Sequence, residues 1–260
     1  NQPAIALTDN NNLFGALEFS EKSSNLGLQP IIGSQINIKD KFGLNEIVML
    51  VKNEVGYSNL SKLVSLGYFN AINSNEPFVT YENIIKHSEG IFVLSGGIFK
   101  GFIPSSLNNK SDRILLERLS FLEKIFKKNY FIELQRFESI YDLNIENKLI
   151  EIAYEYKIPL VATNDVFFRD NSMQEAHEVL MCIEKGMTFS NFNRPKVSKD
   201  NFFKTNNQMI NLFKDIPEAI NNTIIIAQKC SFRPTTSKPI LPNFKIQSNR
   251  DEQEELKFIS

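Results

Sequence analysis

The sequence predicts an α/β fold in which short apolar strands alternate with amphipathic helices. Six apolar runs have the length of strands, at residues 5–8, 30–38, 46–51, 91–95, 130–135 and 160–163. Segments with the apolar spacing of a helix separate most of these runs. Mostly apolar strands that alternate with helices indicate parallel strands buried on both faces, so we expect a largely parallel sheet.

Helical patterns lie between the strands and continue after the last one. Thr80 is a typical N-cap for a short helix that ends near His87. The other helical patterns cover residues 13–27, 57–68, 111–128, 141–156, 172–185, 209–213 and 216–229. From about Asn206 the pattern is purely helical, which predicts a C-terminal helical segment.

Six strands fit an open, doubly wound sheet, whereas a closed barrel needs at least one more strand. The chain begins without Met and enters a strand within a few residues. We therefore expect a further strand upstream of Asn1 to complete a barrel, and the open sheet stays as the structural alternative.

The C-terminal part is rich in proline, at positions 234, 239 and 242. Proline cannot continue a helix, so this stretch is typical of a linker, and residues 251–259 then begin a new amphipathic helix. We accordingly divide the chain into a barrel domain, residues 1–232, and a linker with the start of a following region, residues 233–260.

Bulk composition excludes several classes of protein. The net charge of −1 and the pI near 6.3 give no basic field, so the chain by itself is not expected to bind DNA. Cys182 and Cys230 have no CxxC companion, and we interpret them as reduced thiols near the core. Neither a signal peptide nor a membrane-length apolar run is present, so we expect no membrane association and a cytoplasmic location.

Two of the strands are followed by an aspartate where the chain enters a loop. Asp9 ends the first run and Asp165 ends the last. In an α/β barrel the carboxyl ends of the strands form the active-site face, so we expect both carboxylates at one mouth. A transition-metal site would place histidines beside them, yet the following residues are Asn10, Val166 and Phe167. The spacing is that of a metallohydrolase whose ligands have been replaced.

Seven blocks of sequence, in order, resemble one protein family. They lie at residues 6–15, 27–33, 56–60, 89–97, 161–165, 176–180 and 215–223. Together they resemble the PHP (polymerase and histidinol phosphatase) domain at the front of bacterial replicative DNA polymerases of the C family. The resemblance implies a distorted, TIM-like (β/α)7 barrel, whose first strand carries a His-x-His pair and lies upstream of Asn1.

The resemblance also implies where a metal site would lie. In metal-binding relatives, histidines and carboxylates at the barrel mouth hold three metal ions. Here Asp9 and Asp165 keep the family residue, Gln35 stands for a glutamate and Gly97 for a cysteine. Histidine is replaced at the four remaining positions, Asn10, Glu46, Phe137 and Phe167. These eight residues define the expected vestigial cleft.

The chemistry of these side chains indicates loss of the metal site. Phe137 and Phe167 have no lone pair and would fill ligand positions with hydrocarbon, while Gln35 and Asn10 are weak neutral ligands. Asp9, Glu46 and Asp165 leave open a single hard cation such as Mg²⁺. Neither histidine follows a strand: His177 is expected to pack in a helix, and His87 to be solvated near a helix C-terminus. We expect no bound metal and no catalytic residue in this domain.

Three functions compete. The resemblance implies a non-catalytic PHP domain that serves as scaffold and docking platform in a replicative polymerase. Its expected partners are the other polymerase subunits, including a proofreading exonuclease subunit, with DNA bound by the downstream polymerase region, whose site uses Mg²⁺. The alternatives are an active metal-dependent phosphoesterase or 3′–5′ exonuclease, and an unrelated cytosolic α/β enzyme. The low number of retained ligands favours the first over the second, and the seven ordered blocks disfavour the third.

Overall fold

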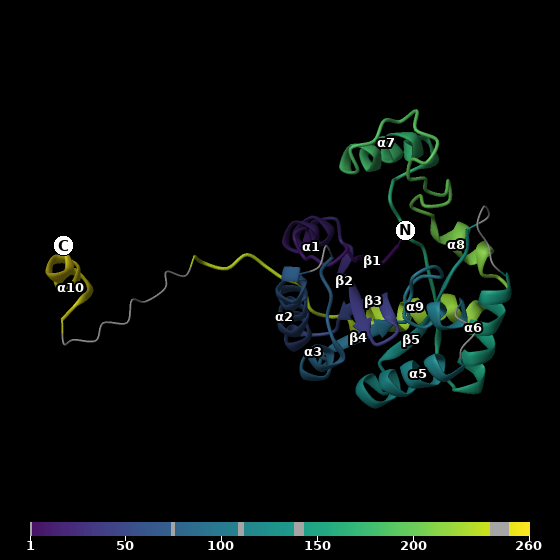
Figure 1. The fold of residues 1–260 in the computed structure, drawn as a ribbon, viewed down its shortest axis with the longest axis horizontal. Coiled ribbons are helices and arrows are strands. Elements are labelled where there is room, and N and C mark those ends of the chain that lie inside the picture. Colours follow the sequence, from purple (N-terminus) through teal and green to yellow (C-terminus); the bar gives the residue numbers. More distant parts are fainter. Residues whose placement is uncertain (1, 74–75, 109–111, 138–142, 240–249) are drawn as a thin grey trace.

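The structure is a computed structural model, which describes residues 2–73, 76–108, 112–137, 143–239 and 250–260. Six strands form one curled sheet in which neighbours in sequence are neighbours in space. Figure 1 shows this sheet at the centre of the molecule with helices packed around it. The strands are β1 (Ala4–Leu7), β2 (Gln29–Asp40), β3 (Gly43–Val51), β4 (Ile91–Leu94), β5 (Tyr130–Gln135) and β6 (Leu160–Thr163). The α/β class and all six predicted strands are confirmed.

The prediction of parallel strands is wrong for β3. β1 and β2 are parallel, as are β4, β5 and β6, but β3 is antiparallel to both β2 and β4. The cause is the tight turn between β2 and β3, in which the backbone N–H of Phe42 donates to Asp40 Oδ1 at 2.8 Å. Only a crossover of a dozen or more residues can make consecutive strands parallel, and this turn is too short for one.

The strand pairing leaves the predicted seven-stranded barrel open. Within the part of the chain that the structure describes, pairing runs from β1 at one edge of the sheet to β6 at the other. The six strands therefore form a curled half-barrel rather than a closed cylinder. A seventh strand upstream stays a prediction.

The predicted helices are present, with boundaries that differ by a few residues. Thr80 is confirmed as an N-cap. Its side chain accepts from the backbone N–H of Asn83, and the Asn83 side chain accepts from the backbone N–H of Thr80. One five-residue helix, α4, is too short to give a periodic pattern and was not predicted. The α-helices are α1 (Ala16–Asn25), α2 (Glu54–Asn70), α3 (Tyr81–Lys86), α4 (Pro104–Asn108), α5 (Asp112–Phe126), α6 (Leu143–Glu155), α7 (Gln174–Glu184), α8 (Asn206–Leu212), α9 (Pro217–Lys229) and α10 (Glu252–Ile259), with 3-10 turns η1 (Ala71–Asn73) and η2 (Asn171–Met173).

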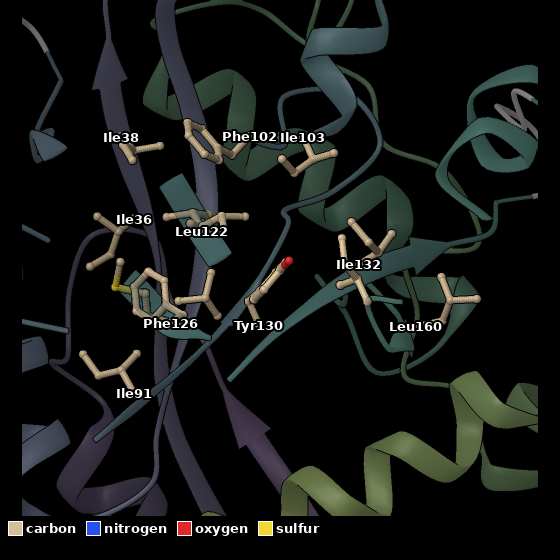
Figure 2. Packing of buried hydrophobic residues seen from close by; sticks show 14 of the residues in the cluster. Ile36, Ile38, Ile91, Phe102, Ile103, Leu122, Phe126, Tyr130, Ile132 and Leu160 are labelled. Carbon is tan, nitrogen blue, oxygen red and sulfur yellow. The ribbon is translucent and has the colours of Figure 1, made fainter. Parts of the chain in front are cut away.

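Alternate residues of each strand pack into two different clusters. On the outer face, strand residues such as Ile36 and Ile132 pack against Leu122 and Phe126 of α5, as Figure 2 shows. The inner face packs against Ile226 and Cys230 at the end of α9; its strand residues are Ile31, Val48, Leu50, Phe92, Leu94, Phe131 and Val161. Because strand side chains alternate between faces, this division fixes which polar residues can enter the inside of the half-barrel.

A buried ion pair joins the turn end of the β2–β3 hairpin to α5. Arg118 Nε donates to Asp40 Oδ2 at 2.8 Å, and both side chains are almost fully buried. Arg118 Nη1 also donates to the Phe102 carbonyl at 2.6 Å and to Ser105 Oγ at 2.7 Å. A buried charge pair is tolerated when its remaining donors are satisfied in this way.

Beyond β6 the chain leaves the half-barrel and returns. In Figure 1, α7 projects from the body of the molecule. The returning segment, residues 198–204, is bonded to the exit of β6: the Phe167 N–H donates to the Asn201 carbonyl at 2.9 Å, and the Phe203 N–H donates to the Phe168 carbonyl at 3.0 Å. We call residues 166–204 the α7 unit.

The C-terminal segment is bonded to the barrel beyond the predicted boundary at residue 232. Ser20 Oγ donates to the Pro234 carbonyl at 2.8 Å, and Thr236 Oγ1 donates to Glu21 at 2.9 Å. The division of the chain into two parts stays a prediction, and part of the expected linker, residues 240–249, falls outside the described residues.

Cys182 and Cys230 are both free thiols and both buried, as predicted. Among the helices that the structure describes, none combines the length and the apolarity needed to cross a bilayer.

Candidate functional site

The reversal of β3 brings Glu46 to the mouth of the half-barrel. β3 runs against its neighbours, so its beginning lies at the edge where β2 and β4 end. In the pairing of β2 with β3, Glu46 lies opposite Asn37. Asn37 is two positions after Gln35, so the side chains of Gln35 and Glu46 lie on the same face of the sheet. Gln35 Nε2 donates to Glu46 Oε2 at 2.8 Å. Two positions expected at the vestigial cleft are therefore in direct contact.

Gly97 faces the end of β5. A Cβ atom at this position would lie 2.7 Å from Gln135 Oε1, closer than carbon and oxygen approach without a bond. The Gln135 carboxamide thus occupies the space that a cysteine side chain at position 97 would need. Gln135 Nε2 donates in turn to Glu133 Oε1 at 3.0 Å.

Glu133 is the most buried carboxyl group at the mouth, with 4% of the residue exposed. Its Oε1 accepts hydrogen bonds from Gln135 Nε2 and from Thr163 Oγ1, while its Oε2 has no hydrogen-bond partner among the described residues. Burial raises the pKa of Glu133 to about 7, and the negative charge of Asp165 acts in the same direction. Glu133 is therefore partly protonated near neutral pH.

Asp165 and Glu46 share this environment. Burial raises the pKa of Asp165 to about 6, and the charge of Glu46 adds to the effect. Burial also raises the pKa of Glu46, against the opposing Lys100 ammonium, whose Nζ lies 3.7 Å from Glu46 Oε1. The three carboxyl groups therefore titrate as an interacting set, in which ionisation of one disfavours ionisation of the next.

Asp9 and Asn10 lie at the same edge but are exposed. β1 and β6 run in the same direction, so the predicted placement of Asp9 and Asp165 at strand ends on one edge is confirmed. The Asp9 carboxylate points towards α1, with Oδ2 3.6 Å from the place of a Cβ at Gly15. Asn10 forms an isolated bridge with Gln35. The Asp9 carbonyl accepts from Ser34 Oγ at 2.7 Å, which bonds this residue to β2 through its backbone.

The two phenylalanines behave differently. Phe137 is buried just after β5. That its ring fills a former ligand position stays a prediction. Phe167 is 43% exposed and stacks on the His177 ring with 5.2 Å between centroids. That it fills a former ligand position stays a prediction. Stacking on an aromatic partner confirms the packed role of His177. His87 ends α3 as predicted, and burial together with Lys62 and Lys86 lowers its pKa.

The residues at the mouth do not fit a transition-metal cluster. Among the described residues, no group of three or more His, Cys, Asp or Glu side chains is arranged to hold a metal ion. One oxygen of Glu46 accepts a hydrogen bond from the Gln35 carboxamide at 2.8 Å. The side chains brought together at the mouth supply only carboxyl and carboxamide groups, a donor set that does not suit a transition-metal cluster.

Sequence reasoning assigned no role to Glu133 or Gln135. The available signal was a charged residue in the middle of an otherwise apolar strand, at the same parity as Phe131 and Gln135. A glutamate at an inward-facing position of an otherwise apolar, buried strand indicates polar surroundings on that face. Lys204 is a further buried residue near the mouth: it is 9% exposed, and its Nζ donates to Asn164 Oδ1 at 3.0 Å, beside Asp165.

With the geometry in place, comparison with known proteins identifies the class. Residues 1–137, more than half of the chain, match the PHP domain family, and the chain belongs to that family.

Its relatives are replicative polymerase subunits. DNA polymerase III subunit alpha of Caulobacter vibrioides is 36% identical over 262 residues, which cover 98% of this chain and 23% of the relative. The subunits of the same name from Rickettsia bellii and Vibrio cholerae are 40% and 33% identical over 93% of this chain, and each match covers 21% of the relative. The chain thus spans about a fifth of the length of these relatives, and the resemblance found from sequence is confirmed.

Two solved structures have a similar chain course. One, a putative metal-dependent phosphoesterase from Bifidobacterium adolescentis, has a TM-score of 0.40 and 14% identity over 63% of this chain and 77% of that chain. The other, an amidohydrolase from Chromobacterium violaceum, has a TM-score of 0.38 and 12% identity over 62% of this chain and 75% of that chain.

Proposed function

We propose that this chain is the PHP domain of a bacterial replicative DNA polymerase, in which it acts as a metal-free scaffold and docking domain. The single observation that carries the proposal is the contact between Gln35 and Glu46, which joins two former ligand positions by a hydrogen bond of 2.8 Å. A carboxylate that accepts from a neighbouring amide is satisfied without a cation. The relatives supply the polymerase context.

Loss of phosphoester hydrolysis follows from the same side chains. Hydrolysis of a phosphodiester at neutral pH needs a metal-activated water or an equivalent nucleophile. The mouth offers Glu46, Glu133 and Asp165, whose raised pKa values weaken them as ligands because a protonated carboxyl group binds cations poorly. We therefore assign no catalytic residue to this domain.

The longer polypeptide is proposed to synthesise DNA in the cytoplasm. Its polymerase site, with paired carboxylates and Mg²⁺, would lie in the region that follows the proline-rich segment. That region would also contact DNA. Other replicative subunits, among them a proofreading exonuclease subunit, are the proposed partners that dock on this domain.

Metal analysis of the purified polypeptide tests the scaffold assignment. After dialysis against buffer without metal, we expect no stoichiometric Zn, Mn or Fe and no metal-dependent 3′–5′ degradation of single-stranded DNA. Asp165→Ala serves as the test variant, and Asp112→Ala, at an exposed position at the start of α5, as its matched control. Two or more bound ions, with degradation that only Asp165→Ala abolishes, would replace the scaffold proposal by the phosphoesterase.

The phosphoesterase alternative is kept because one observation favours it. Neighbouring carboxyl groups with strongly raised pKa values are typical of functional sites. Burial raises the pKa of Glu133 to about 7 and that of Asp165 to about 6, and the charge of Asp165 acts on Glu133. If the alternative is correct, Glu133→Gln abolishes hydrolysis, whereas under the scaffold proposal this variant changes only stability.

Deletion tests the docking role. The full polypeptide is expected to extend a primed DNA template, and removal of the residues upstream of Pro234 is expected to lower its stability or its binding of partner subunits. Unchanged stability and unchanged subunit binding after the deletion would contradict a scaffold role.

A further inference from the structure

A groove runs along the exposed side of α2, and its volume is about 850 Å³. Its lining comes from α2, from His87 at the end of α3 and from the segment after α9, residues 232–235. The other side of α2 packs on the outer face of the sheet through Leu60 and Leu63. The groove therefore shares no residue with the mouth.

The two walls of the groove are held together by contacts of the fold itself. The Phe232 ring packs on the Tyr57 ring of α2 with 5.2 Å between centroids. Two residues later, the Pro234 carbonyl accepts from Ser20 Oγ of α1 at 2.8 Å. The segment is thus attached to both α1 and α2, and the groove is formed before any ligand enters, as is usual for ligand sites.

The lining has an excess of positive charge. Lys62 and Arg233 are exposed, and neither forms an ion pair within the part of the chain that the structure describes. Among the described residues, the lining contains one carboxylate, Glu54. Burial together with the ammonium groups of Lys62 and Lys86 lowers the pKa of His87, so the charges that act on this ring are positive. Such a surface favours an anionic ligand.

The remaining lining is aromatic and hydroxylic. Besides the paired rings of Tyr57 and Phe232, it includes Phe69, which is 68% exposed. Ser61 Oγ donates to the Tyr57 carbonyl at 2.9 Å, and Ser65 Oγ donates to the Ser61 carbonyl at 2.9 Å. Because their protons are engaged, these two hydroxyl oxygens can only accept from a ligand, for example from the hydroxyl groups of a sugar. Aromatic rings, in turn, receive the flat face of a nucleobase.

We propose that this groove binds a free nucleotide, with its phosphate group at Lys62 and Arg233 and its base on the aromatic part of the lining. A nucleotide supplies an anion, hydroxyl donors and a flat ring in one molecule, and the lining offers a partner for each. The volume of about 850 Å³ is that of a site for such a ligand, whereas inorganic phosphate would fill only a small part of it. This site goes beyond the proposed function, because it does not depend on what the mouth holds.

Lysine acetylation in the full-length polypeptide tests the proposal. Peptide mass spectrometry compares Lys62 with Lys128, an exposed lysine after α5 that lies outside the groove. EDTA is present, so that nucleotide binding that requires Mg²⁺ does not contribute. With adenosine monophosphate at about 1 mM, we expect Lys62 to react about fivefold more slowly and Lys128 to react at an unchanged rate, because bound ligand protects in proportion to occupancy.

Matched variants and partial ligands locate the contacts. Arg233→Glu removes one of the two cations and should abolish the protection of Lys62, whereas Arg113→Glu on α5 should keep it. Both positions are exposed, so both variants should keep the wild-type circular dichroism spectrum. Adenosine lacks the phosphate and inorganic phosphate lacks the base, so each should protect Lys62 by no more than about twofold at the same concentration.

Each other outcome overturns the proposal. An unchanged rate at Lys62 means that the groove binds no nucleotide, and protection that survives Arg233→Glu places the nucleotide elsewhere. Equal protection by inorganic phosphate means a nonspecific anion surface, and equal protection by adenosine means that the cations have no part. Protection by single-stranded oligodeoxyadenylate or by a glutamate-rich peptide, but not by adenosine monophosphate, identifies a nucleic acid strand or an acidic segment as the occupant. Metal analysis tests the mouth separately, so the two failures are distinguishable.

Discussion

Two regions of this molecule bury carboxyl groups, and they do so in opposite ways. At the turn end of the β2–β3 hairpin, Asp40 is paired with Arg118, whose other donors reach Phe102 and Ser105. At the mouth, Glu133 is equally buried, yet its Oε2 has no partner among the described residues and the nearby charges of Asp165 and Glu46 are also negative. One region neutralises its carboxylate with a cation and the other with a proton.

The difference indicates which region is built for stability. A buried ion pair with satisfied donors is strongly destabilised when one partner is removed, because the remaining charge is left buried. A buried carboxyl group without a cation costs stability when it ionises, so removing its charge relieves strain. At the mouth, the raised pKa values of Glu133 and Asp165 keep the negative charge of the cluster low near neutral pH.

Removal of the Arg118 guanidinium group, which pairs with Asp40, is expected to have the largest effect on stability. Arg118→Ala leaves Asp40 unpaired in the core and should lower the free energy of unfolding by about 3–5 kcal/mol. Urea denaturation followed by circular dichroism measures the change. Arg113→Ala, at an exposed position on the same helix, is the control and should be nearly neutral. A loss for Arg118→Ala no larger than that of Arg113→Ala would remove the contrast between the regions.

Removal of the negative charge of Glu133 should change how the free energy of unfolding depends on pH. The pKa of Glu133 is about 7 in the folded chain and 4.5 in the reference state, so the folded state binds more protons over this window. Stability from this group is present below pH 4.5 and is lost as pH rises towards 7. Glu133→Gln should therefore reduce the loss of unfolding free energy between pH 5 and pH 8 by on the order of 2 kcal/mol.

Denaturation at both pH values measures this difference. Glu151→Gln, at an exposed position of α6, is the control and should keep the wild-type pH dependence. Asp165 titrates in the same direction, so part of the pH dependence should survive in Glu133→Gln. A pH dependence identical to that of the wild type would mean that Glu133 does not hold a proton in the folded state.

A smaller loss of stability is expected at Ser105, which is hydrogen-bonded to Arg118 of the buried ion pair. Ser105 Oγ accepts from Arg118 Nη1 at 2.7 Å, and its own hydroxyl group donates to Asn45 Oδ1. Ser105→Ala should lower the free energy of unfolding by about 1.5 kcal/mol, the lower end of the contribution of a hydrogen bond to a charged group. Ser120→Ala, exposed on α5, is the matched control in the same denaturation experiment. Similar values for the two variants would show that Arg118 does not depend on this hydroxyl group.

The smallest effect is expected from metal chelation. If the mouth holds no ion, as proposed, EDTA should not change the midpoint of thermal unfolding, which a bound structural ion would raise by mass action. Calorimetry with and without EDTA measures it. A fall in the midpoint that added Zn²⁺ or Mn²⁺ reverses would show that the mouth does hold an ion.

The sequence by itself determined the strands and helices, because their signals are local. Apolar runs marked all six strands, Thr80 marked a helix start, and ordered motif blocks indicated the PHP family. That phenylalanine at positions 137 and 167 cannot ligate a metal was also readable without a structure, since a side chain without a lone pair binds no metal wherever it lies.

Only the tertiary structure decided how these parts meet. The direction of β3 depends on a tight turn, and that direction brings Glu46 to Gln35. Strand parity, combined with packing on α9, places Glu133 inside the half-barrel, whereas Phe167 turns away to His177. The pKa values at the mouth follow from burial and from charges on other strands. These features arise between residues far apart in the chain, and local spacing carries no record of such distances.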